Sequence, residues 1–94
     1  MSVRVRLPRL LSECTGGRTS VALDLPDPAT VCGVLDALAA DHPVFDRRVR
    51  DETGALRRHV NVYVDGEEVR RLAGLATPVP AGGEVMVVQS VAGG

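Results

Sequence analysis

The sequence predicts an α+β fold, in which a mixed five-stranded sheet carries one main helix on one of its faces. Two alternating apolar runs open the chain, a helical segment follows them directly, and three further strand-like runs complete the order. One helix cannot cover both faces of a sheet. The second face is therefore expected to be open to water or to a partner.

The first two strands are predicted from strict alternation. Residues 2–8 place Val3 and Val5 on one side and Arg4 and Arg6 on the other, which is typical of a half-buried strand. Residues 18–26 alternate in the same way, and the glycines before them suit a turn. The two runs are predicted to form an opening β-hairpin.

The period changes over residues 27–43, where apolar residues recur at helical spacing. Thr30 or Asp27 can cap the start of this helix, and Pro43 is expected to set its end. Gly33 lies inside it, at a cost of about 1 kcal/mol relative to Ala, and is interpreted as a point of close packing against the sheet. Residues 44–59 are expected to form a short helical turn and an exposed charged loop.

The remaining strands surround an irregular stretch. Residues 59–69 predict a strand, a turn at Asp65 and Gly66, and a second strand, whereas residues 84–89 predict the last strand. This element order suits the β-grasp arrangement, in which the last strand pairs beside the first in the middle of the sheet. Periodicity alone is also compatible with a ferredoxin-like or other α+β fold. The single long helix directly after a hairpin favours the β-grasp.

Composition excludes several classes of function. The 94 residues carry a formal net charge of −1, which gives no bias toward nucleic acid or membranes. No signal peptide or membrane span is expected, so the protein is predicted to be cytoplasmic. Cys14 and Cys32 are far apart and are interpreted as idle thiols, and no metal site is expected. Because no acid/base pair or nucleophile–base pair is evident, the chain is not expected to be an enzyme.

The last residues form a second feature. Residues 1–89 are predicted to be the folded domain, and residues 90–94, "SVAGG", a mobile tail. A terminal carboxylate reacts poorly until AMP is transferred to it, after which a sulfur nucleophile can displace the AMP. Glycine suits threading into an active site, and five extended residues reach roughly 17 Å. Glycines in a disordered tail without a role are the alternative interpretation.

Together with the β-grasp order, the segments "AGGEVMVV" and "VAGG" resemble the MoaD/ThiS family of ubiquitin-like sulfur carriers. The stretch "HVNVYVDGEEVRRLAGLAT" with the terminal "SVAGG" is similar to the CysO branch, which serves cysteine biosynthesis. The resemblance implies adenylation of the Gly94 carboxylate and its conversion to a thiocarboxylate. It also implies that Val91, Ala92 and Gly93 thread into the active sites of partner enzymes.

The resemblance implies three partners. An E1-like enzyme of the MoeB/ThiF type would use ATP, a cysteine synthase would use pyridoxal phosphate, and a JAMM-type peptidase would use zinc. The carrier itself would bind no cofactor or metal and is expected to be a monomer. Gln89 and Ser90 stand where molybdopterin-type carriers commonly have two prolines, which argues against that branch.

A docking face for these partners is predicted by alternation, on the side of the sheet away from the helix. The exposed set is expected to include Arg4, Arg6, Asn61, Tyr63, Met86 and Val88. An exposed Met-Val-Tyr patch often marks an interface, although ordinary strand residues with partial exposure would give the same pattern. Residues 57–59, "RRH", are interpreted as a solvated charged loop, with an acidic partner or a nucleotide phosphate as the alternative.

Other functions remain compatible with the sequence. The chain could be the small subunit of a molybdopterin synthase, or a carrier for thiamin or for sulfur in secondary metabolites. It could also be a ubiquitin-like modifier that joins Gly94 to lysines of other proteins, or a non-covalent binding module. A binding module would tolerate extra residues after Gly94, whereas the carriers and the modifier would not.

Overall fold

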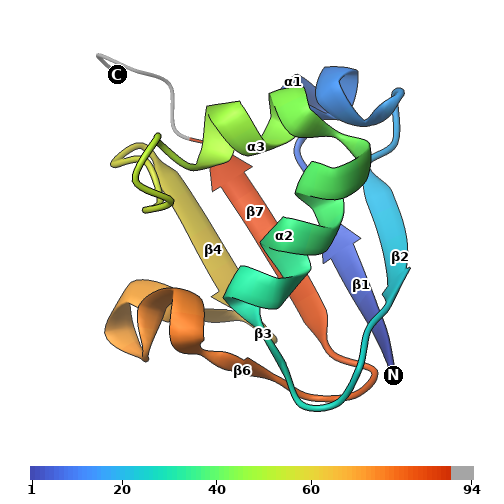
Figure 1. The fold of residues 1–94 in the computed structure, drawn as a ribbon, viewed down its shortest axis with the longest axis vertical. Coiled ribbons are helices and arrows are strands. Elements are labelled where there is room, and N and C mark those ends of the chain that lie inside the picture. Colours follow the sequence, from blue (N-terminus) through green and yellow to red (C-terminus); the bar gives the residue numbers. More distant parts are fainter. Residues whose placement is uncertain (90–94) are drawn as a thin grey trace.

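The sheet of this computed structural model, which describes residues 1–89, has the predicted β-grasp topology (Figure 1). Its five strands run in the order β2-β1-β7-β4-β5, and β7 is parallel to β1 and antiparallel to β4. The last strand therefore lies beside the first, as predicted. The strands are β1 (Ser2–Arg6), β2 (Ser20–Asp24), β4 (Val60–Val64), β5 (Glu67–Glu68) and β7 (Glu84–Gln89).

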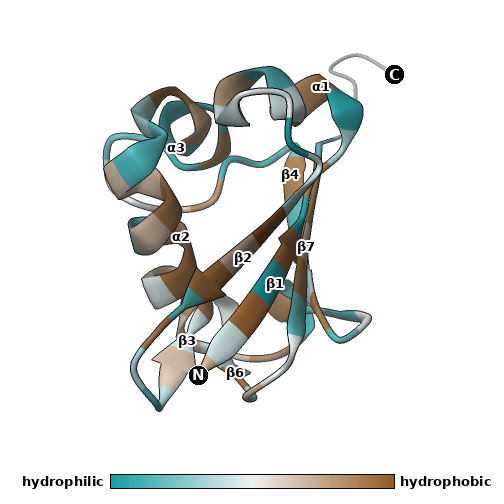
Figure 2. Ribbon diagram, turned by 90° about the vertical axis from the view of Figure 1, so that its right-hand side faces the viewer, coloured by the Kyte–Doolittle hydropathy of each residue, from teal (hydrophilic) through white to brown (hydrophobic). Residues whose placement is uncertain are grey.

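Alternation divides the sheet into two faces. Val3 and Val5, predicted to share one face of β1, are buried, and alternation in β4 and β7 buries valines on the same side. All belong to one hydrophobic core: Val3, Val5, Val60, Val62, Val64, Val85 and Val87. Figure 2 shows hydrophobic and hydrophilic positions alternating along β1, with α2 and α3 on one side of the sheet. The helix-covered face thus takes the apolar side chains, and the charged ones point away from it.

The main helix is α2 (Val31–Asp41), which is capped by Thr30 as predicted: the Gly33 backbone N–H donates to Thr30 Oγ1 at 3.2 Å. The interpretation of Gly33 as a close-packing position was wrong. A Cβ built on Gly33 would meet only Thr30 Oγ1, at an ordinary contact distance of 3.7 Å. Gly33 is half-buried, and no atom of the five-stranded sheet lies within 4 Å of such a Cβ.

Two further helices lie within the described residues. Pro43 ends the main helical run and begins α3 (Pro43–Val49), which is longer than the predicted helical turn and buries Phe45 and Val49. Charged residues follow Phe45 directly, so the local pattern does not signal its burial, which depends on tertiary contacts within the core. The opening hairpin contains α1 (Arg9–Ser12) and a 3-10 turn, η1 (Glu13–Thr15), in its connection.

The stretch predicted to be irregular holds small elements. They are the 3-10 turns η2 (Val69–Arg71) and η3 (Gly74–Ala76) and the strand β6 (Pro78–Val79), which pairs with β3 (Ala29–Thr30) ahead of α2. The predicted turn between β4 and β5 is confirmed, with Asp65 and Gly66 both at positive φ. None of the helices in residues 1–89 is long and apolar enough to cross a membrane.

Candidate functional site

The open face of the sheet brings together the residues predicted for docking. Tyr63 of β4 pairs with Met86 of β7, which pairs on its other side with Arg6 of β1. A neighbouring pair joins Asn61 to Val88. These side chains therefore form adjacent rows across the three central strands, where directly opposed residues lie about 4.5–5.5 Å apart. That a partner docks on them stays a prediction.

This face is apolar at its centre and charged at one side. Met86 is 37% exposed, Tyr63 and Val88 are half-buried, and Arg6 is exposed. Arg4 is also exposed, and Arg6 lies 3.9 Å from Glu84 in a weak surface ion pair. A shallow groove of about 230 Å³ runs beside Met86 and Val88, lined also by Arg6, Leu7, Pro8 and Val87. An apolar partner side chain could enter this groove.

Arg70 joins η2 to the start of β4. Its Nη1 donates to the Val60 carbonyl oxygen at 2.7 Å and to Asn61 Oδ1 at 2.6 Å, and its Nη2 donates to the Arg57 carbonyl oxygen at 2.9 Å. These bonds hold Asn61 in place on the open face and fix the loop that leads into β4. The sequence analysis missed Arg70, because its partners lie 9 to 13 residues away and no local spacing signals such contacts.

A cationic pocket lies beside Arg70. Its lining consists of Asp51, Leu56, Arg57, Arg58, His59 and Arg70. The Arg57 Nε donates to the Arg47 carbonyl oxygen at 2.8 Å, while Arg58 is exposed. The "RRH" loop predicted as solvated thus joins a residue from η2 to form a concave surface. The pocket is one strand away from the last described residue, because Arg70 bonds the carbonyl oxygen of Val60 and Val60 pairs with Gln89.

The tail lies outside the described residues. The predictions for Val91, Ala92, Gly93 and Gly94, and the division into a domain of 1–89 and a tail of 90–94, stay predictions. What the structure does describe is the strand that precedes them. Gln89 ends β7, which pairs with β1 over Glu84–Met86 and with β4 from Val85 to Gln89. The segment 90–94 therefore follows a strand end that pairs with β4.

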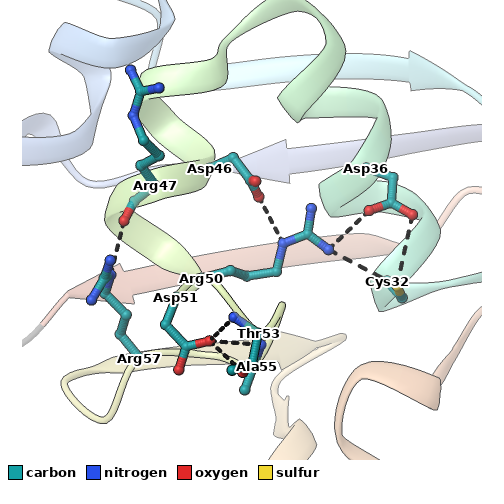
Figure 3. A network of polar contacts seen from close by, with 9 residues as sticks. All are labelled: Cys32, Asp36, Asp46, Arg47, Arg50, Asp51, Thr53, Ala55 and Arg57. Atoms are coloured by element: carbon teal, nitrogen blue, oxygen red, sulfur yellow. Dashed lines mark hydrogen bonds and ion pairs between the residues drawn. The ribbon is translucent and has the colours of Figure 1, made fainter.

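A third polar region lies between α2 and α3 (Figure 3). Arg50, only 8% exposed, directs its Nε to Asp46 Oδ1 at 2.7 Å and its Nη1 to Asp36 Oδ1 at 2.9 Å. The same Nη1 lies 3.9 Å from Cys32 Sγ. Cys32 and Cys14 are both free thiols, and residues 1–89 hold no cluster of three side chains suited to a metal ion. This network connects two helices and contains no nucleophile–base pair.

Two groups in this region have shifted pKa values. Burial opposes the charged form of Arg50, but its hydrogen bonds to Asp46 and Asp36 outweigh that effect and raise the pKa of the guanidinium. Hydrogen bonds from the Thr53 side chain and backbone, with a further one from Ala55, lower the pKa of Asp51. Arg50 and Asp51 therefore both stay ionised near neutral pH.

The fold and the open face together define a ubiquitin-like β-grasp protein. The model of the ThiS family matches residues 5–94. The chain belongs to this family, the ThiS/MoaD group of sulfur carriers.

Among known proteins, the chain is similar to the sulfur carrier protein CysO of Mycobacterium tuberculosis, with 38% identity over 96 residues and complete coverage of both chains. It is also 39% identical over 84 residues to small archaeal modifier protein 1 of Haloferax volcanii, covering 89% of this chain and 91% of that protein. The first of these relatives is a sulfur carrier by name, as the sequence resemblance implied, and the second is a modifier by name, which was one of the alternative functions.

Solved structures support the same relationship. The crystal structure of the Haloferax volcanii modifier has a TM-score of 0.84 at 35% identity and full coverage of both chains. That of Mycobacterium tuberculosis CysO has a TM-score of 0.82 at 36% identity, covering 95% of this chain and 99% of that one. A chain of the BexX/CysO complex of Amycolatopsis orientalis has a TM-score of 0.80 at 35% identity, covering 98% and 99%.

Proposed function

We propose that this chain carries sulfur as a thiocarboxylate on Gly94. The carboxylate attacks the α-phosphate of ATP, which gives an acyl-adenylate and releases pyrophosphate. A sulfur nucleophile then attacks the acyl carbon, and AMP leaves with the electron pair of the broken bond. Net transfer of sulfide leaves Gly94 with a thiocarboxylate in place of its carboxylate.

The full-length similarity to CysO is the observation that carries this proposal. The similarity spans 100% of both chains, and the family match continues to Gly94. The similarity to a CysO-containing complex supports a protein partner rather than a small-molecule substrate. The described residues contribute a held strand, β7, directly before the segment that would enter the partner's active site.

An E1-like enzyme of the MoeB/ThiF type would perform the activation with ATP. Cysteine biosynthesis is the proposed destination: a pyridoxal-phosphate-dependent synthase would accept the sulfur, and a zinc-dependent JAMM-type peptidase would release the product. In this scheme ATP, pyridoxal phosphate and zinc all belong to the partners. The carrier supplies its tail and the open face with Arg4, Arg6, Asn61, Tyr63, Met86 and Val88.

The test is the intact mass of the chain after incubation with ATP, an activating enzyme from the same source and a sulfide donor. Replacement of one oxygen by sulfur is expected, and a chain lacking Gly94 should not change. Adding the synthase with O-phosphoserine should then give a cysteinyl adduct. An unchanged mass, with an enzyme shown to activate another carrier, would contradict the proposal.

Protein modification is a second candidate, favoured by the 39% identity to small archaeal modifier protein 1. Gly94 would then form an amide with lysines of other proteins. The chain contains no lysine of its own, so side-chain-linked polymers of it cannot form. Tagged chain recovered from cells in denaturant distinguishes the two: covalent conjugates of higher mass indicate a modifier, and free chain alone indicates a carrier.

A further inference from the structure

We infer that the cationic pocket lined by Arg57, Arg58, His59 and Arg70 is a docking site for an acidic surface of the activating enzyme, at the entrance of the channel that receives residues 90–94. The inference rests on the proposed function and adds a recognition surface to it. Three features support it: uncompensated charge, rigidity and position.

The positive charge of the pocket is only partly neutralised within the described part of the chain, by Asp51. Three guanidinium groups line it against one carboxylate, that of Asp51. The ion pairs of the described residues involve the N-terminus, Arg6 and Arg50, and none involves Arg57, Arg58 or Arg70. Asp51 already accepts hydrogen bonds from the Thr53 and Ala55 backbone N–H groups and the Thr53 hydroxyl. The pocket therefore presents a net positive charge although the chain as a whole is slightly negative.

The pocket is also held in shape before any partner binds. Arg70 bonds the carbonyl oxygens of Arg57 and Val60, and Arg57 bonds the carbonyl oxygen of Arg47. These side chains therefore fix the backbone on both sides of Arg58 and lose little further freedom on binding. Such preorganisation reduces the entropic cost of association. Arg58 itself is exposed and available to a carboxylate.

The position of the cationic pocket favours a protein surface over a nucleotide as its ligand. The pocket lies one strand away from Gln89, because Arg70 bonds the carbonyl oxygen of Val60 and Val60 pairs with Gln89. Gly94, whose carboxylate would meet ATP, is five residues further along the chain. An extended segment of that length spans roughly 17 Å. An extended tail of this length would place the pocket toward the rim of the partner's channel and the ATP phosphates at the channel's far end.

Arg58→Glu tests this with the intact chain and the activating enzyme. The initial rate of pyrophosphate release is measured against carrier concentration at low and high salt. The KM for the carrier is expected to rise about tenfold at low salt, with kcat changing less than twofold. The difference should shrink at 1 M salt, where the Debye length falls to about 3 Å.

Two control variants distinguish an effect of the charge in the pocket from an effect of the overall charge of the chain. Arg18→Glu makes the same charge change in the connection that leads into β2, the edge strand on the opposite side of the sheet from β5. This variant should change the KM for the carrier less than twofold. Arg58→Lys retains the charge and should restore most of the affinity. Circular dichroism and thermal melting check that each variant is folded.

Three results would overturn the inference. An unchanged KM for Arg58→Glu would do so, as would an equal effect of Arg18→Glu. A rise in the KM for ATP in place of that for the carrier would assign the pocket to nucleotide phosphates. In all three cases the wild-type chain is still activated, so the proposed function stands. If the wild-type chain is not activated by a demonstrably active enzyme, the proposed function fails and the inference falls with it.

Discussion

Two arginine-centred regions of this molecule differ in how their charge is balanced. Arg50 is buried between α2 and α3 and contacts two carboxylates, Asp36 and Asp46. Arg70 and its neighbours Arg57 and Arg58 line an open pocket, and Arg70 and Arg57 bond backbone carbonyls and an amide. A buried charge must be paired within the fold, whereas an exposed charge can be left for a partner. The comparison teaches that Arg50 serves stability and that the cationic pocket is suited to recognition.

The largest expected effect comes from Arg50→Met, which keeps the apolar stem and removes two charge-assisted hydrogen bonds. The free energy of unfolding in urea should fall by about 2 kcal/mol. Arg48→Met on the exposed side of α3 is the control and should change it by less than about 0.5 kcal/mol. Sulfur loading of the folded fraction should be unchanged. A loading defect without loss of stability would contradict the assignment of Arg50 to stability.

Met86→Glu tests whether the open face of the sheet contributes to docking in addition to the cationic pocket. A carboxylate at the centre of an apolar contact should raise the carrier KM about tenfold, or 1.4 kcal/mol, with little change in stability. Val44→Glu, at an exposed valine on α3, is the matched control. An equal KM for Met86→Glu and wild type would remove the open face from the docking model.

Arg70→Lys separates geometry from charge in the pocket. Lysine keeps the positive charge but cannot make the same three bonds to Arg57, Val60 and Asn61. Stability should fall by about 1 kcal/mol, and the carrier KM should rise by less than for Arg58→Glu. A variant with wild-type stability and wild-type KM would show that these three bonds are not needed to keep the pocket in its shape.

Gly33→Ala changes the main helix without touching either arginine region. Because the added Cβ meets only an ordinary contact, helix propensity should dominate and raise stability by about 0.5–1 kcal/mol, measured by urea unfolding. Gly17→Ala is the contrasting control, since Gly17 has a φ of +85° and should lose stability. A destabilised Gly33→Ala would restore the close-packing interpretation.

The smallest effect is expected from Asp51, a solvated carboxylate with a lowered pKa. A depressed pKa in the folded state stabilises the fold above the ordinary value of 3.8 and loses that contribution as the pH falls below it. The melting temperature of Asp51→Ala should therefore differ from wild type at pH 6 and converge with it toward pH 2. NMR titration of Asp51 gives a direct check, and a pKa at or above 3.8 would contradict it.

Much of the fold was predictable because its signals are local. Alternation assigned the valines of β1, β4 and β7 to the buried face, and helical spacing with Thr30 as cap located α2. The burial of Phe45 in α3 and the pairing of β3 with β6 were missed, because each depends on a partner distant in sequence. The open face followed from the same alternation, so the residues expected there do lie together.

The sequence by itself determined the strand and helix periods, the two faces of the sheet and the family to which the chain belongs. The periods and the two faces depend on side-chain spacing, which repeats every two residues in a strand and about every 3.6 in a helix. The family was indicated by particular segments, above all residues 81–88 and the terminal "VAGG". Only the tertiary structure decided which arginines are compensated. The spacing of Asp46 and Arg50 in the sequence permits one ion pair along a helix. Folding then brings the distant Asp36 to Arg50, whereas it places backbone and amide oxygens beside Arg70.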